Sequence, residues 1–111
     1  MQAGKQNRRV AIDVPMTTQN ATGEEITDFV ELSEVWASIE PIRGREALLN
    51  GLNAAQMDTR IRMRWSEALD AMTTDWRIRY KETYYDLISI AHIRTGRREL
   101  EILAKSGTNL G

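Results

Sequence analysis

The heptapeptide TRIRMRW, residues 59–65, carries the clearest periodic signal in the chain. Ile61, Met63 and Trp65 alternate with three arginines. A period of two places successive side chains on opposite faces of a β-strand, so this stretch predicts a half-buried strand with a basic outer face. Residues 76–81 repeat the pattern, with aromatic and aliphatic side chains alternating with basic ones.

Weaker alternation extends to both sides of this strand. The predicted strands cover residues 10–14, 26–29, 35–41, 58–65, 76–81, 84–93 and 97–105. Pro15 and Pro41 are expected to end the strands before them, because proline cannot donate to a β-ladder. The polar stretch 17–25 is expected to form a loop or wide hairpin turn, and Thr95-Gly96 a tight one.

One segment, at about 43–57, breaks the strand pattern. Leu48, Leu52 and Ala55 fall on helical spacing while Gly51 weakens a helix, so we expect a short helix or a long loop there. Residues 66–73 are expected to form one or two helical turns. The fold predicted for residues 1–111 is a single, mainly β domain: a small antiparallel β-barrel or sandwich of six to seven strands.

The composition excludes several classes of protein. A chain of 111 residues, 41% hydrophobic, holds one modest core but not two lobes around a substrate cleft. It has no cysteine, a single histidine (His92) and no nucleotide-binding or nucleophile-elbow motif, so we expect no enzyme, no metal and no cofactor. No stretch approaches the roughly 20 apolar residues that span a bilayer, so no membrane partner is expected.

The charge is segregated although its sum is only −1. Residues 11–42 contain seven acidic residues and no Lys or Arg, whereas residues 43–111 contain twelve basic and nine acidic ones. The alternating arginines have two interpretations: a solvated outer face, or a stripe that meets an acidic neighbour or a nucleic-acid backbone. The candidate subunit interface is therefore formed by Glu24, Glu25, Asp28, Glu31 and Glu34 on one side and Arg60, Arg62 and Arg64 on the other.

The three tryptophans are expected to anchor the core. Trp36, Trp65 and Trp76 each fall on a strand-like alternation, and no aromatic cluster of the kind that stacks nucleic-acid bases accompanies them.

The order of several short motifs resembles a known family. Gly4-Lys5 and the run from Arg8 to Ile12 precede a polar turn, then come Trp36-Ala37-Ser38-Ile39-Glu40-Pro41 and Gly44-Arg45-Glu46. The strands at 59–65 and 76–80 follow, and then Tyr84-Tyr85-Asp86-Leu87-Ile88-Ser89-Ile90. From Gly4 to about Lys105 the chain resembles the head–tail joining proteins of long-tailed bacteriophages, also called head-closure or stopper proteins.

The resemblance implies a structural virion protein without enzymatic activity or cofactor. It implies a small β-barrel that assembles in the bacterial host cytoplasm as a homo-oligomeric ring below the portal or adaptor after DNA packaging. In the virion neck this ring would retain the genome and give a docking surface to the tail terminator or tail tube. The family's long loop maps to residues 42–57, where the candidate channel residues, in transient contact with genomic DNA, are Arg43, Arg45, Leu48, Leu49, Gly51, Leu52 and Ala55.

Two alternatives remain at this point. A tail-terminator or tail-completion protein is also a small ring-forming β protein of similar length. A small nucleic-acid-binding β-barrel is the other class, but the near-neutral charge and the lack of a stacking motif argue against it.

Overall fold

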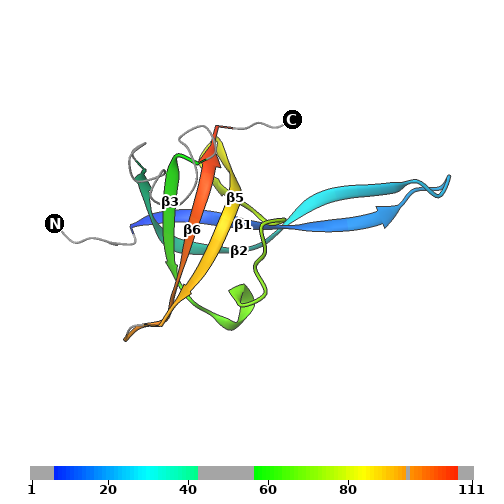
Figure 1. The fold of residues 1–111 in the computed structure, drawn as a ribbon. Helices are drawn as coiled ribbons and strands as arrows, with labels where there is room; N and C mark the ends of the chain where they lie inside the picture. Colours follow the sequence, from blue (N-terminus) through cyan, green and yellow to red (C-terminus); the bar gives the residue numbers. More distant parts are fainter. Residues whose placement is uncertain (1–6, 43–56, 95, 108–111) are drawn as a thin grey trace.

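The computed structural model describes residues 7–42, 57–94 and 96–107. These residues form a closed antiparallel barrel with the strand order β1-β2-β3-β6-β5-β4, which confirms the predicted fold class (Figure 1). The strands are β1 (Arg8–Gln19), β2 (Glu25–Pro41), β3 (Thr59–Arg64), β4 (Arg77–Tyr80), β5 (Thr83–Ile93) and β6 (Glu99–Ser106). A short 3₁₀ helix, η1 (Glu67–Leu69), lies between β3 and β4.

The barrel interior follows the predicted alternation. On β3, Ile61 and Met63 are fully buried and face the interior, whereas the arginines between them face outward. Ile78 takes the same place on β4, and Leu69 of η1 covers one end of the barrel. The buried core comprises Val10, Ile12, Ala37, Ile61, Met63, Leu69, Met72, Ile78, Tyr85, Leu87, Leu100, Ile102 and Ala104.

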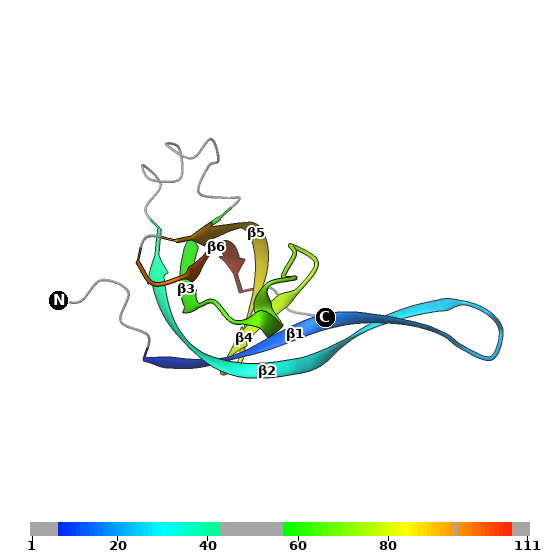
Figure 2. The ribbon, with the colours of Figure 1, turned by 90° about the horizontal axis from the view of Figure 1, so that it is seen from below.

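The β1–β2 hairpin extends well beyond the barrel. β1 pairs with β4 only from Ala11 to Asp13, but it pairs with β2 along its whole length. Residues 14–30 therefore leave the barrel as a two-stranded ribbon, here called the hairpin arm (Figure 2). The arm accounts for the elongated shape, with extents of 53 × 30 × 24 Å.

A β-bulge marks the root of the arm. Ile12 pairs with Ser33 and Asp13 with Glu31, so Leu32 is an extra residue on β2. A bulge of this kind bends its strand and increases the local twist, and here it lies where the ribbon turns away from the barrel.

The boundaries of the first two strands correct the prediction. β1 does not end at Pro15 but continues to Gln19, and the expected polar loop 17–25 is reduced to the turn between Gln19 and Glu25. The predicted strands 26–29 and 35–41 are one continuous strand, β2. Pro15 is tolerated because β1 has left β4 by then, and a strand with an open edge can accept proline.

The remaining elements agree more closely with the prediction. β5 and β6 form the expected hairpin, with Gly96 in the turn at a φ of 77°. η1 supplies the short helical turn expected within 66–73. The segment expected as a loop or helix at about 43–57 lies, apart from Met57, outside the described residues. No helix among the residues that the structure describes is long and apolar enough to cross a bilayer.

Candidate functional site

The hairpin arm exposes an apolar face. Val10 and Ile12 point into the barrel core, and the same face of β1 continues onto the arm as Val14 and Met16. The same face of β2 adds Val30, opposite Val14, and Ile26, opposite Thr18 and four residue pairs further out. Met16, Ile26 and Val30 are 51%, 39% and 41% exposed. The arm therefore extends the core-facing side of the sheet past the point where a core covers it.

The opposite face of the arm is fixed to the barrel at its root. Arg77 and Arg79 of β4 both donate to the carboxylate of Asp13, at distances of 2.8–3.2 Å. Arg79 also donates to Glu31 across the bulge at 3.0 Å. The guanidinium of Arg77 stacks on the ring of Phe29, 4.1 Å from its centroid. These contacts set the direction in which the arm leaves the barrel.

The charges of this cluster are mutually stabilised. Burial by itself would raise the pKa of the Asp13 carboxyl, but the hydrogen bonds and charges of Arg79 and Arg77 outweigh it and hold that pKa below its usual value. The same contacts raise the pKa of Arg79, chiefly through its hydrogen bonds to Asp13.

The five acidic residues of the candidate interface divide into two groups. Glu31 is paired with Arg79, and Glu34 lies 3.5 Å from Arg9. Glu24, Glu25 and Asp28 lie exposed on the arm, and Glu24 accepts a hydrogen bond from the Asn20 side chain within the turn. Only the second group leaves its negative charge open to a partner.

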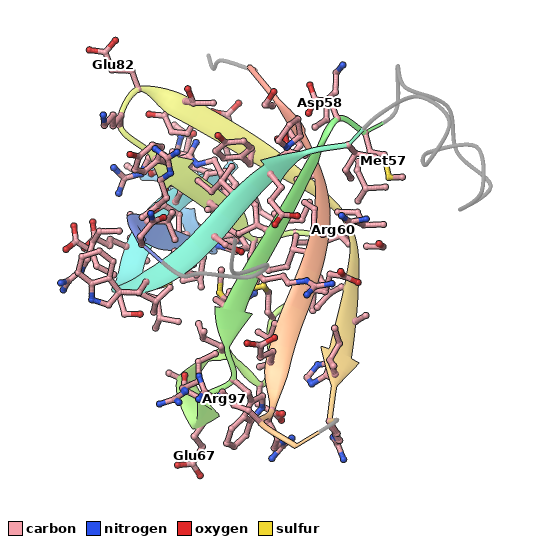
Figure 3. The ribbon with its side chains drawn as sticks, turned by 90° about the vertical axis from the view of Figure 1, so that its left-hand side faces the viewer. Met57, Asp58, Arg60, Glu67, Glu82 and Arg97 are labelled. Atoms are coloured by element: carbon pink, nitrogen blue, oxygen red, sulfur yellow. The ribbon has the colours of Figure 1, made fainter. Side chains whose placement is uncertain are left out.

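The three arginines of β3 divide in the same way. Arg60 and Arg62 contact the carboxylate of Glu101 on β6 at 3.2 and 2.8 Å, and Arg60 also lies 3.6 Å from Glu40. Figure 3 shows Arg60 on the outer surface of the barrel. Arg64, at the end of the strand, is exposed. The stripe is thus largely neutralised within the chain, which argues against a continuous basic track for nucleic acid.

A hollow of about 320 Å³ opens beside Arg64 at the end of β3. It combines indole rings, arginines and no carboxylate, and we call it the indole hollow. Its lining residues are Val35, Trp36, Arg64, Trp65, Ser66 and Arg97. The sequence pattern predicts Arg64 as a contact residue but not Arg97. Arg97 comes from the β5–β6 turn and is brought close only by the pairing of β3 with β6.

The two indoles of the hollow are held by arginines. Arg9 lies over the ring of Trp36 at 5.4 Å and Arg98 over the ring of Trp65 at 3.8 Å, in cation–π geometry. The Trp65 indole N–H donates to Asp70 at 2.9 Å. Trp36 is 53% exposed, so the expectation that it anchors the core is wrong: it lies on the outer face of β2. Trp65 and Trp76 do pack against the core, as expected.

The candidate channel residues Arg43, Arg45, Leu48, Leu49, Gly51, Leu52 and Ala55 lie outside the described residues. The residues that flank this segment, Ile42 and Met57, belong to the described ranges. Ile42 and Met57 are buried together against Leu103, and the Ile42 N–H donates to the carbonyl of Asp58 at 2.9 Å. Figure 3 shows Met57 and Asp58 at the same end of the barrel.

Asp58 ties these ends to the last strand. Its carboxylate accepts hydrogen bonds from the Thr59 hydroxyl and from the backbone and hydroxyl of Ser106. Burial alone would raise the pKa of Asp58, but these bonds and Lys105 hold it below the usual value. The segment 43–56 therefore begins and ends at adjacent points on the barrel.

Within the described ranges, no cluster of three or more His, Cys, Asp or Glu side chains could hold a metal ion. His92 lies exposed on β5. The exposed features that stand out among the described residues are the apolar, acidic arm and the arginine-flanked hollow.

Comparison with known proteins identifies the family. The family model described as phage head completion protein matches residues 1–107. The chain belongs to this family. Its description is that of a structural component that completes the phage head and not of a class of enzymes, and it agrees with the resemblance found in the sequence.

Two solved structures share the fold of this head completion protein. The solution structure of protein SF1141 from Shigella flexneri 2a is 23% identical, with a TM-score of 0.79, and the alignment covers 99% of this chain and 100% of that one. A chain in the virion of a native gene transfer agent particle is 15% identical, with a TM-score of 0.59, and 90% of this chain and 93% of that one are covered. Among curated proteins there is no match.

Proposed function

We propose that this head completion protein is a ring-forming head-closure connector. In this proposal it binds below the portal or adaptor once DNA is packaged, retains the genome, and offers the docking surface for the tail terminator or tail tube. Assembly takes place in the host cytoplasm, and the ring remains in the virion neck. The observation that carries the proposal is the family match across residues 1–107.

The molecular surface supports this proposal. A ring of identical copies needs two different, complementary patches on each copy. The chain offers an acidic, apolar arm and an arginine-flanked hollow, and both are exposed. The gene transfer agent chain with this fold belongs to a virion particle, which is consistent with a place in the neck.

Genome retention is assigned in this proposal to residues 43–56. The barrel presents both ends of this segment at one point, so copies arranged in a ring would bring their segments to a common level. The small and apolar composition of residues 47–55 suits a plug that excludes water when closed and offers little charge to grip phosphate when DNA leaves.

Particles produced without this protein test the function. The expected result is heads that package DNA, fail to join tails and lose DNA during purification, and adding the purified protein before the heads leak restores joining. Electron microscopy and DNA content per head give the readouts. DNA-filled heads that stay full, accompanied by free tails of abnormal length, would instead assign the protein to the tail-terminator class.

A further inference from the structure

We propose that the hairpin arm of one copy docks in the indole hollow of the next copy, head to tail around the ring. The inference rests on the proposed ring and identifies the two surfaces that build it. The arm supplies its apolar face and the carboxylates of Glu24, Glu25 and Asp28, and the hollow supplies Trp36, Trp65 and two arginines.

The arm carries exposed hydrophobic side chains of the kind that protein interfaces bury. Apart from Ile88 on β5, every large hydrophobic residue that is at least 36% exposed among the described ranges lies on β1 or β2. Along the arm Met16, Ile26 and Val30 share one face of the ribbon, whereas Phe29, opposite Pro15, lies on the other face against Arg77. An isolated two-stranded ribbon is marginally stable in water, so a covering surface would stabilise the arm as well as the assembly.

Charge complementarity indicates which surface covers the arm. Residues 14–30 contain three acidic residues and no Lys or Arg. The lining of the hollow contains Arg64 and Arg97, both exposed, and no carboxylate. Neither arginine forms an ion pair within the part of the chain that the structure describes. Two carboxylates border the hollow without lining it: Asp70 accepts the hydrogen bond from the Trp65 indole, and Glu99 lies opposite Arg64 in the β3–β6 register.

The residues that line the hollow also favour binding of an apolar surface. Tryptophan and arginine are the residues that most often dominate the binding energy of protein interfaces. Here both indoles are already oriented by Arg9, Arg98 and Asp70, so little side-chain freedom remains to be lost on docking.

The geometry fits a ring and not a two-fold dimer. The arm projects from one side of the barrel, whereas Trp36 pairs with Arg9 at the other end of β1 (Figure 1). Figure 3, which looks at the barrel from the side opposite the arm, shows Arg97 near its lower end. Patches on different sides give a heterologous contact, which closes into a ring when the rotation per copy permits.

Cysteine crosslinking in assembled particles tests the contact. The chain has no cysteine, so Asp28→Cys with Arg64→Cys introduces the only two thiols. After treatment of purified particles with a short bismaleimide, the doubly substituted chain should form a ladder of covalent multimers. Chains with either cysteine alone should remain monomeric, because in a head-to-tail contact position 28 never meets position 28.

The crosslinking outcomes separate this inference from the proposed function. A crosslink from position 28 to a different virion protein, in particles that hold several copies of this chain, overturns the arm contact and leaves the ring intact. A single copy per particle by quantitative mass spectrometry overturns both. A dimer from Asp28→Cys alone also overturns the head-to-tail arrangement.

A charge exchange gives a second, independent test. Arg64→Glu with Arg97→Glu, and separately Glu24→Lys with Asp28→Lys, should each reduce head–tail joining severalfold, and the fourfold variant should recover it. Glu82→Lys, exposed at the β4–β5 turn and away from both surfaces (Figure 3), is the matched control and should join normally. A fourfold variant no better than either pair would contradict the contact.

Discussion

Asp13 connects the barrel to the hairpin arm through a single buried carboxylate. The residue is 2% exposed and accepts hydrogen bonds from both Arg77 and Arg79. Asp13→Asn leaves two arginines without their anion, although both can still reach water. We expect the free energy of unfolding to fall by about 2 kcal/mol, measured by urea denaturation. Glu31→Gln, which removes one exposed contact to Arg79, is the control and should cost less than about 1 kcal/mol.

The lowered pKa of Asp13 also predicts how stability depends on pH. A carboxyl whose pKa is lower in the folded state than in the unfolded state contributes its full stability above the ordinary pKa of 3.8, and loses that contribution as pH falls below it. The decline in stability between about pH 5 and pH 2 should therefore be shallower in Asp13→Asn than in the wild type. If stability falls equally steeply with pH in the two proteins, folding does not lower the pKa of Asp13.

Two residues with similar sequence patterns should behave differently when replaced by alanine. Ile61 is fully buried in the barrel, so Ile61→Ala should cost about 2–5 kcal/mol. Trp36 is 53% exposed, so Trp36→Ala should cost less than about 1 kcal/mol and yet impair head–tail joining. Ile88→Ala, another exposed apolar residue, is the control for joining. Equal losses of stability for Trp36→Ala and Ile61→Ala would contradict the placement of Trp36 on the outer surface and show that it packs in the core.

The alternation that predicted the barrel could not show which face of β2 is covered. At Ile61 the two faces differ in polarity, so the sequence indicates which side is inside. At Trp36 the neighbours are Val35 and Ala37, both apolar, and the outward face is determined only by pairing with Arg9. Arg97 was missed for a related reason: it lies 33 positions after Arg64 in the sequence, and no local pattern connects them.

At the scale of elements, the hairpin arm is separable from the barrel. Its outer residues pair only with each other, and the barrel is closed by residues 8–13 of β1 and the second half of β2. The sequence did not predict this long ribbon, because Pro15 and the polar residues after it are typical of a strand end and a loop. β1 has left β4 by Pro15, and it continues to pair with β2 as far as Gln19 and Glu25, with the Thr17 and Thr27 hydroxyls hydrogen-bonded across the ribbon.

Truncation of the arm tests this separation. Replacing Met16 through Asp28 with Asn-Gly joins the two strands by a turn that hairpins favour, and it keeps Phe29 beside Arg77. The removed residues are exposed, so the free energy of unfolding should change by less than about 1 kcal/mol. The shortened chain should nevertheless be absent from particles, as measured by quantitative mass spectrometry. A barrel that no longer unfolds cooperatively would show that the arm contributes to the fold itself.

At the scale of the whole molecule, the connection between β2 and β3 is residues 43–56, which lie outside the described residues. Deleting Leu48 through Ala54 leaves seven of the fourteen residues between Ile42 and Met57. Seven residues easily bridge two points already joined by the bond from Ile42 to Asp58, and halving a loop changes its closure entropy by less than about 1 kcal/mol. The isolated variant should therefore keep a wild-type unfolding midpoint.

The same deletion separates the fold from genome retention. If the segment plugs the channel, particles carrying the shortened chain should package DNA and then lose it, even though the arm and the indole hollow are untouched and the ring still forms. Retained DNA per head and copies of the chain per particle are the two measurements. Ile42→Ala, which weakens the buried contact with Met57 without shortening the segment, is the control, and should retain DNA if the barrel folds. Full retention by a correctly assembled shortened ring would contradict the plug and leave residues 43–56 as a docking surface for a neighbouring protein of the neck.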